Sequence, residues 1–401
     1  MARPRSGKPE AMSREHLEAI WRAGMESCLP ERVVPAHLPE PPRGRTFLLA
    51  LGKAAVPMAR AAEARWPGPL SGLAVTPRGT EARVERVEVI GSAHPVPDRA
   101  SLAAAQRLLG LAREAGPDDL VLVLLSGGAS SLACLPGEGL DLAGKQRLTG
   151  AMLRCGASVS EINCVRRHLS RFKGGRLGLA AGPAQLVTLA ISDVAGDAPH
   201  EIGSGPTAGD PTTVAEARAI LRRYGIEEPG AGWSETPEAV PGGYRIVASQ
   251  ADALAAAAAR AEALGYAPIL IASSGEARDV ARDHAGLVGR LGPGTALISG
   301  GELTVTVRGD GRGGPNQEYA LAAALALSGR PGIAGLAADT DGIDGSGESA
   351  GAFFGGGGAP GGEAALEAND SGAWFERRGG LFVTGPTGTN VSDLRILLVA
   401  P

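Results

Sequence analysis

Three aspartates lie close together among glycines in the segment AADTDGIDGSGESAG, which spans residues 337–351. They are Asp339, Asp341 and Asp344. Clustered carboxylates beside glycines are typical of calcium loops and of magnesium sites for phosphate chemistry, but they also occur in polar turns. The spacing of the aspartates and the element that precedes them decide between these three readings.

A calcium loop of the EF-hand type needs an oxygen ligand at its fifth position, Gly at its sixth and Glu at its twelfth. Counted from Asp339, these positions hold Ile343, Asp344 and Ala350, which excludes such a loop. The aspartates follow the apolar run GIAGLAA, so they lie at the carboxyl end of a predicted strand, where ligands collect in α/β sheets. We predict that Asp339 and Asp341 contact a nucleotide and that Asp344 caps the glycine turn, with a purely structural turn as the alternative.

A glycine-serine loop follows another predicted strand, in the segment LLSGGASSL. Glycines at such a point let backbone N–H groups approach an anion, and the serines add hydroxyl donors. A nucleophile elbow is disfavoured, because it needs Gly two residues after its Ser, whereas the residue two positions after Ser130 is Leu132. We predict phosphate or carboxylate binding here, over a simple strand-to-helix turn, by Ser126, Gly127, Gly128, Ser130 and Ser131.

Basic residues occur at two further places. Lys53 ends the strand-like run RTFLLALGK and begins a helix, so it is placed to neutralise phosphate charge, with a solvated first-turn residue as the alternative. The segment INCVRRHLSRFKGGRLG concentrates basic residues at 162–178. Helical spacing places Arg166 and Lys173 on one face, and we predict that these two bind substrate although most such runs are solvated. His168 is either a base or structural, and a lone His is more often structural.

The segment ISDVAGDAPHEIGSGPTAGDPTT, residues 191–213, supplies oxygen atoms after a predicted strand. A carboxylate at a strand end followed by a Gly/Ser/Pro loop suits magnesium or a substrate hydroxyl, and an Asx-rich capping loop is the alternative. We predict Asp193 and Asp197 as metal ligands, and Ser204 and Thr207 as substrate contacts. Glu302, in SGGE, is a further candidate for metal or hydroxyl contact.

Two glycine motifs resemble nucleotide-binding signatures. GLDLAGKQ at 139–146 nearly matches a P-loop, but Gln146 lacks the hydroxyl that holds magnesium and no strand precedes the motif. GDGRGG at 309–314 fits the dinucleotide pattern after an apolar run. The alternative for GDGRGG is a glycine loop that places Arg312 and Asn316 near a phosphate.

Composition excludes several classes of protein. The 401 residues carry a net charge of −4 and only 3% aromatic residues, which disfavours binding to nucleic acid or to an anionic membrane. The sequence has no uninterrupted apolar run as long as a membrane span and no signal peptide. The four cysteines show no paired spacing, so we expect free buried thiols and a cytoplasmic protein.

Continuous Val/Leu/Ile runs alternate with helix-like Ala/Leu/Arg segments along the chain. This pattern predicts an α/β fold with parallel sheets that are covered on both faces. The Pro- and Gly-rich stretch 224–243 lacks periodicity and indicates a linker or an exposed loop. Two α/β lobes with a cleft between them are the simplest architecture for this pattern.

Ten motifs taken together resemble one family, the glycerate 2-kinases of the MOFRL type. The similarity runs in order from about residue 15 to the C-terminus. Its motifs are LGKAA, GSAHPVPD, LLSGGASSL, RRHLSRFKGGRL, ISDVAGD, IGSGPTAGDPTT, SGGELTVTV, GGPNQEYAL, DTDGIDG and GPTGTNVSDL. The resemblance implies ATP-dependent phosphorylation of D-glycerate to 2-phosphoglycerate with Mg²⁺. It implies a Rossmann-like N-terminal domain, here 1–235, and a C-terminal MOFRL α/β domain, here 236–401, with largely parallel sheets and the active site in their cleft.

The resemblance also implies roles for particular residues. It assigns a catalytic lysine to Lys53 and a catalytic arginine to a Gly-Gly-Arg-Asn-Gln block, but this sequence has Pro315 in place of that arginine. We expect Arg312 to supply the missing charge, with a basic residue of 166–176 as the alternative, and Asp193 to hold Mg²⁺ or to orient the substrate hydroxyl. Because some family members are labelled hydroxypyruvate reductases, an NAD(P)H-dependent reductase is the alternative activity. The oligomeric state is open, and a homodimer is possible.

Overall fold

The computed structural model describes residues 8–401. The chain forms two compact units, and each is treated by itself. The first unit comprises residues 30–247, and the second combines the described residues up to Leu29 with residues 248–401. The division differs from the expected one at residue 235, because the first helix packs within the second unit and the chain passes between the units after Val247.

The first unit is built on a six-stranded sheet in the order β3-β2-β1-β4-β5-β6. This is the strand order of a doubly wound, Rossmann-like sheet, as the family resemblance implied. The pairings from β3 through β5 are all parallel. The strands are β1 (Thr46–Leu51), β2 (Leu70–Pro77), β3 (Glu88–Ser92), β4 (Leu120–Leu125), β5 (Gln185–Ile191) and β6 (Gly243–Ala248).

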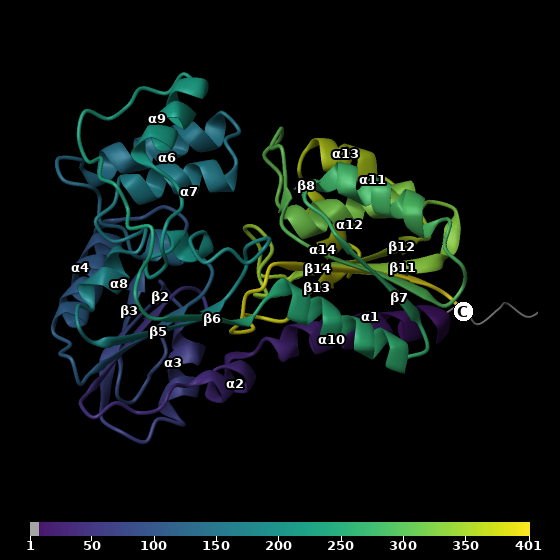
Figure 1. The fold of residues 1–401 in the computed structure, drawn as a ribbon. Helices are drawn as coiled ribbons and strands as arrows, with labels where there is room; N and C mark the ends of the chain where they lie inside the picture. The colour runs from purple at the N-terminus through teal and green to yellow at the C-terminus, as the bar shows by residue number, and fades with distance from the viewer. Residues whose placement is uncertain (1–7) are drawn as a thin grey trace, which may run out of the picture. The chain divides into compact units, whose positions relative to one another are not determined.

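Helices cover both faces of this sheet, with α3 on one face and α4 and α8 on the other (Figure 1). A second group of helices, α6, α7 and α9, packs around its own apolar cluster. The helical segments are α2 (Pro30–Val33), η1 (Pro35–His37), α3 (Ala55–Glu63), α4 (Arg99–Arg113), α5 (Ala129–Leu132), α6 (Leu142–Arg154), α7 (Val159–His168), α8 (Arg176–Ala180), η2 (Ile202–Ser204) and α9 (Val214–Arg223).

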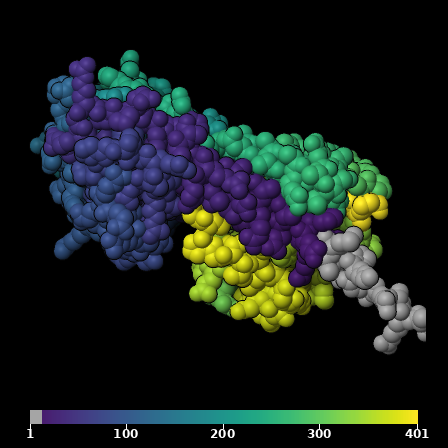
Figure 2. All heavy atoms as spheres, turned by 90° about the horizontal axis from the view of Figure 1, so that it is seen from below, coloured from purple at the N-terminus to yellow at the C-terminus, as the bar shows by residue number. Residues whose placement is uncertain are grey.

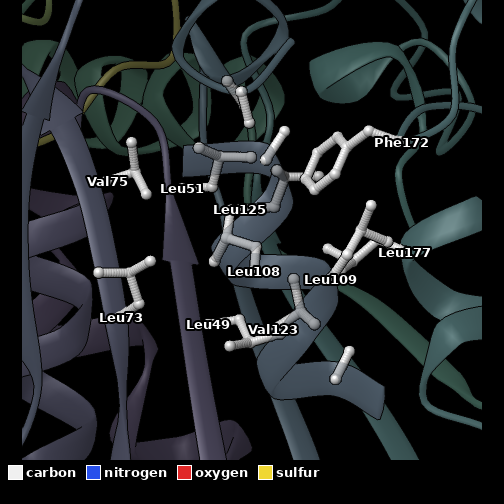
Figure 3. Packing of buried hydrophobic residues seen from close by; sticks show 14 of the residues in the cluster. Leu49, Leu51, Leu73, Val75, Leu108, Leu109, Val123, Leu125, Phe172 and Leu177 are labelled. Carbon is white, nitrogen blue, oxygen red and sulfur yellow. The ribbon is translucent and has the colours of Figure 1, made fainter. Parts of the chain in front are cut away.

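The core of the first unit explains why the central strands have no polar face. Every residue of β1 and β4 is buried, as expected for parallel strands with helices on both sides. Alternate residues of these strands, such as Leu49 and Val123, point toward Leu108 and Leu109 of α4 (Figure 3). This packing fixes where each strand ends, and therefore where the loops that follow it begin.

The second unit contains a six-stranded sheet in the order β13-β12-β11-β14-β9-β7, and a separate two-stranded sheet pairs β10 with β8. Its strands are β7 (Ala267–Ala272), β8 (Gly275–Glu276), β9 (Thr295–Gly300), β10 (Leu303–Thr304), β11 (Arg330–Asp339), β12 (Gly351–Gly356), β13 (Leu381–Phe382) and β14 (Asp393–Val399). Its helices are α1 (Lys8–Ser27), α10 (Gln250–Ala263), α11 (Ala277–Val288), α12 (Pro315–Ala326), α13 (Gly362–Glu367) and α14 (Ser371–Glu376).

The expectation of a largely parallel sheet is wrong for the second unit. Only the β7–β9 pairing is parallel, and the other pairings of the six-stranded sheet are antiparallel. For the β11–β12 pair the reason lies in the connection between the two strands, which contains no helix, so the chain turns back instead of crossing over the sheet. Helices α11 and α12 pack on one face and α1 and α10 on the other, and Figures 1 and 2 show α1 beside α10.

Two smaller expectations can be checked. The stretch 224–243 contains no helix or strand before Gly243, where β6 begins, and nearly all of its residues are exposed or half-buried, which confirms the exposed loop. The loop belongs to the first unit: Ser234 N–H donates to His168 O, and Asp210 N–H donates to Pro237 O. Three cysteines are free and buried, whereas the fourth, Cys155, is exposed.

Candidate functional site

The strand order of the first unit places its topological switch point between β1 and β4. Ligands bind at this switch point in doubly wound sheets, outside the carboxyl ends of the strands. Lys53 follows β1 there, and the loop from Ser126 to Gly128 follows β4. Two hydrogen bonds join the loops: Lys53 N–H donates to Gly127 O at 2.8 Å, and Ala54 N–H donates to Ser126 Oγ at 3.0 Å. The predicted lysine and the predicted glycine-serine loop are therefore neighbours.

Gly128 has a left-handed backbone, with φ of 81°. A Cβ atom at this position would lie 3.1 Å from the His94 ring and 3.3 Å from Lys53 Cγ. The glycine is thus required both by backbone conformation and by the close approach of two side chains. His94 was missed as a site residue, although it lies in the motif GSAHPVPD, which follows a predicted strand in the same way as the Lys53 loop does.

A buried hydrogen-bond chain begins at Ser130. Ser130 Oγ lies 2.7 Å from Ser204 Oγ, and Ser204 Oγ donates to Asn163 Oδ1 at 2.9 Å. Asn163 Nδ2 donates to Glu201 Oε2 at 2.7 Å, and Glu201 accepts from Arg167 Nη1 at 3.0 Å. Ser204 also has a left-handed φ of 61°, a conformation that is uncommon for a non-glycine residue and is concentrated at functional sites.

Arg167 is fully buried between two carboxylates. Its Nε donates to Asp210 Oδ2 at 2.8 Å, in addition to its contact with Glu201. Burial opposes ionisation of Asp210, but the Arg167 guanidinium and hydrogen bonds from Thr212 and Thr236 outweigh burial and hold the pKa of Asp210 below its usual value. This ion-pair cluster holds the segment 200–212 against α7 and so fixes the position of Ser204.

His168 is a structural residue of the same cluster. Its ring is buried, with Nε2 3.2 Å from Thr212 Oγ1 and Nδ1 3.2 Å from Ser234 O. Burial lowers the pKa of His168, so the ring is neutral at neutral pH. The structural reading of His168 fits these contacts better than the role of a base.

The two predicted substrate-binding cations differ in their surroundings. Lys173 is buried and its Nζ donates to Ser130 O and Ala133 O, so it holds the end of the glycine-serine segment. The guanidinium of Arg166 is half-buried and makes no hydrogen bond or ion pair with any residue between 8 and 401. Burial lowers the pKa of both residues. An unpaired, partly desolvated guanidinium suits an anionic ligand, whereas Lys173 acts through the loop that it holds.

Other predicted residues of the first unit have local roles. The hydroxyl of Ser131 donates to Gly128 O. Thr207 is buried and accepts from Thr188. Asp193 is half-buried just beyond the end of β5, at the same edge of the sheet as Lys53. Asp197 is half-buried in the following loop with a φ of 53°.

In the second unit, polar residues collect at one edge of the six-stranded sheet. The strand register places the last residue of β11, Asp339, opposite the first residue of β14, Asp393. The ends of β7 and β9 lie at the same edge, where Gly300 pairs with Ala272 and with Leu394. Asp339 and Asp341 are therefore near the strand ends as predicted, and each carboxylate accepts a backbone N–H two residues on, from Asp341 and from Ile343.

Asp344 binds the start of α12 and not its own glycine turn. Its carboxylate accepts from the backbone N–H groups of Asn316 and Gln317 at 3.0 and 2.8 Å. The N-cap of α12 is Gly314, which has no side chain for this purpose, so a distant aspartate supplies the cap. The predicted capping role is correct in kind, but the capped element is different.

The side chain of Asn316 lies between two buried carboxylates. Its Nδ2 donates to Asp344 at 3.3 Å and to Asp393 at 2.6 Å, while its Oδ1 is buried and has no hydrogen-bond partner among the described residues. Burial, together with repulsion from Asp393, raises the pKa of Asp344 to about 7. Burial also raises the pKa of Asp393, against the opposing effect of Arg395.

Arg312 and Glu302 are less clearly placed for chemistry. Arg312 is exposed, and its guanidinium forms an ion pair of 2.7 Å with Glu376. Glu302 is exposed in the loop after β9. Surface ion pairs of this kind are weak, so Arg312 can exchange its partner. In the described structure, however, no hydrogen bond joins Arg312 to Asn316.

The glycines of GDGRGG serve close packing. A Cβ on Gly309 or Gly311 would lie 2.5 Å from Ala368 O, so the chain's own backbone fills the space that a pyrophosphate would need. The preceding strand, β10, has two residues and lies outside the six-stranded sheet. The motif therefore lacks the strand–turn–helix context of a dinucleotide fingerprint.

Ser273, His284 and Tyr319 form a second missed group, at the end of β7. Ser273 Oγ lies 2.8 Å from His284 Nε2, and Tyr319 Oη lies 2.7 Å from His284 Nδ1. Burial and the nearby Arg395 lower the pKa of His284 to about 4. No sequence signal pointed to this group, because its members are far apart in the chain and carry no common motif.

Within residues 8–401, no group of three or more His, Cys, Asp or Glu side chains is arranged to hold a metal ion. The helices of this part of the chain also include none with the length and hydropathy of a membrane span.

Comparisons with known proteins agree with this geometry. Residues 16–232 match the domain of unknown function DUF4147, and residues 295–393 match the MOFRL family. The D-glycerate 2-kinase of Thermotoga maritima is 39% identical, over 98% of this chain and 99% of its own length. A protein of Agrobacterium vitis named "Putative hydroxypyruvate reductase" is 43% identical over 97% of this chain and 95% of its own. The crystal structure of a Thermotoga maritima glycerate kinase superposes with a TM-score of 0.87 at 38% identity, covering 98% of this chain and 100% of that one.

Proposed function

This chain, which matches DUF4147 and the MOFRL family, belongs to the glycerate 2-kinase family, and we propose that it phosphorylates D-glycerate to 2-phosphoglycerate with ATP. The observation that carries the proposal is the contact between the Lys53 loop and the glycine-serine loop at the switch point of a Rossmann-like sheet. A cation beside the backbone N–H groups of a glycine loop is what a transferring phosphoryl group needs.

Residues of the first unit have separate roles in the proposed reaction. Lys53 stabilises the negative charge that develops on the transferred phosphoryl group. Backbone groups of Gly127 and Gly128 bind anionic oxygens, which the left-handed, side-chain-free Gly128 allows. Arg166, whose guanidinium has no hydrogen-bond or ion-pair partner among the described residues, binds the substrate carboxylate. Phosphoryl transfer depends mainly on such positioning and charge neutralisation.

The polar edge of the second unit is the proposed nucleotide contact. Asp339 and Asp341 orient nucleotide hydroxyl or amino groups, and Asn316 is fixed by two carboxylates, so that its buried Oδ1 points to a donor or a cation. Arg312 supplies positive charge where Pro315 replaces the arginine of the family motif, which requires it to leave Glu376.

Mg²⁺ accompanies ATP in phosphoryl transfer and neutralises charge on its phosphates. Oxygen ligands suit it, and the Oδ1 of Asn316, which is buried and has no hydrogen-bond partner among the described residues, is an oxygen atom of the kind that the ion accepts. We propose Asp193 and Asp197 as carboxylates that hold the ion and Glu302 as a further candidate. We also place the reaction in the cytoplasm.

An assay run with two substrates separates this proposal from the reductase alternative. The kinase forms ADP only when D-glycerate and Mg²⁺ are both present. The reductase oxidises NADH with hydroxypyruvate and needs no ATP. NADH oxidation without glycerate-dependent ADP formation would refute the kinase proposal, whereas the packed GDGRGG loop leads us to expect no NADH oxidation.

A further inference from the structure

The hydrogen-bond chain that starts at Ser130 has a fixed direction. Glu201 is ion-paired with buried Arg167 and can only accept, so the Nδ2 group of Asn163 must face it. Asn163 Oδ1 is then an acceptor, and the proton in its 2.9 Å contact with Ser204 comes from the Ser204 hydroxyl. Because Ser204 has only one hydroxyl proton, that proton is not available to Ser130.

It follows that Ser130 donates its own proton to Ser204 across the 2.7 Å contact between their Oγ atoms. The hydroxyl of Ser130 therefore presents only lone pairs to its open side. Such an oxygen accepts a hydrogen bond from a ligand hydroxyl but has no proton to give to a phosphate or a carboxylate. This conclusion changes the role expected from the sequence, where the serine was a donor to an anion.

The chain also cannot carry a proton away from Ser130. It ends at the amide of Asn163, which does not accept a proton at neutral pH, so Ser130 cannot act as a general base through it. A hydroxyl that loses its proton during phosphorylation needs a base, whereas a hydroxyl that keeps its proton needs only an acceptor. Ser130 therefore suits the hydroxyl of the substrate that does not react.

We propose that Ser130 accepts a hydrogen bond from the non-reacting hydroxyl of a small dihydroxy acid and so selects such acids over monohydroxy acids. Ser204 is a positioning residue that holds the Ser130 proton away from the ligand. The proposal rests on the proposed function for the identity of the acid, D-glycerate. D-lactate, which lacks the 3-hydroxyl of D-glycerate, is the matched probe.

Isothermal titration calorimetry with D-glycerate and D-lactate tests the proposal without turnover. We expect Ser130→Ala to weaken D-glycerate binding roughly tenfold, the effect of one neutral hydrogen bond, and to leave D-lactate binding within about twofold. Ser130→Thr, which retains the hydroxyl, should restore the preference for D-glycerate. Equal weakening of both acids, or no weakening of either, would overturn the proposal.

Ser204→Gly supplies a second test with a variant that should fold. Glycine adopts the left-handed φ of 61° at this position without strain, but it removes the group that holds the Ser130 proton. We expect the preference for D-glycerate over D-lactate to fall although Ser130 is still present, and an unchanged preference would contradict the proposed direction of the chain. Because binding is measured without ATP, a failure of the kinase assay and a failure of this selectivity are separate results.

Discussion

Asp344 gives the sharpest test of the electrostatics at the start of α12. Its carboxylate is buried, accepts two backbone N–H groups of the helix and lies near Asp393. Burial raises the pKa of Asp344 from 3.8 to about 7. A carboxyl with a raised pKa in the folded state stabilises the fold fully below its unfolded pKa, and that stability is lost as the pH rises through the folded pKa.

The size of the effect follows from the shift in pKa. A rise from 3.8 to about 7 corresponds to about 4 kcal/mol of unfolding free energy, at about 1.4 kcal/mol per pKa unit. Roughly 2.5 kcal/mol of this is lost between about pH 5 and about pH 8, because over this interval the Asp344 side chain is already ionised in the unfolded chain, whereas in the folded chain it keeps its proton until the pH approaches about 7. In Asp344→Asn the side chain does not titrate, so this part of the pH dependence disappears.

Urea unfolding at the two pH values measures the effect, followed by tryptophan fluorescence and circular dichroism. Subtracting the wild-type value from that of Asp344→Asn at each pH removes the contribution of all other groups. We expect this difference to increase by about 2.5 kcal/mol in favour of the variant at the higher pH. Asp310→Asn, an exposed position in the neighbouring loop, should show no such change. A difference that is the same at both pH values would refute the raised pKa.

Three further predictions follow from single positions. Gly128→Ala should lower the free energy of unfolding by about 1–2 kcal/mol and reduce activity, since φ is 81° and the His94 ring is close. The control is Gly156→Ala, where φ is 76° and the surrounding space is open, so this variant should share only the backbone cost. An equal loss of activity in both variants would contradict crowding as the cause. Arg167→Met should cost about 3–5 kcal/mol by leaving buried carboxylates unpaired, against less than about 1 kcal/mol for the exposed Arg223→Met, as thermal unfolding would report. The buried hydroxyl of Tyr319 needs an acceptor, and His284 Nδ1 is its partner, so Nδ1 must carry no proton. ¹⁵N NMR should therefore find the His284 ring neutral at pH 6 with its proton on Nε2, and a proton on Nδ1 would be the contrary result.

The parallel sheet of the first unit could be predicted from the sequence because each of its central strands is marked by its own apolar run. Continuous apolar runs become buried parallel strands, and the residues that follow those strands, Lys53 and Ser126–Gly128, must meet at one edge. The sheet of the second unit was not predictable in the same way. Apolar runs do not report strand direction, and the antiparallel pairings of β14 with β9 and β11 join strands that are far apart in the sequence.

The individual roles at the site depend on contacts between distant residues. Nothing near Asp344 in the sequence indicates that it caps a helix beginning at Pro315. The donor direction at Ser130 is likewise set by Asn163 and by an ion pair further along the chain. Spacing identifies residues that can do chemistry, but hydrogen-bond partners decide what each of them does.

The central claim is the transfer of a phosphoryl group from ATP to the 2-hydroxyl of D-glycerate. ³¹P NMR of the protein incubated with ATP, Mg²⁺ and D-glycerate tests this claim directly, with the Lys53→Ala variant as the comparison. We predict that the wild-type protein produces ADP and one phosphomonoester, 2-phosphoglycerate, and that the variant produces neither at a comparable rate. A phosphomonoester at the 3-hydroxyl, or no phosphomonoester from the wild-type protein, would contradict the claim.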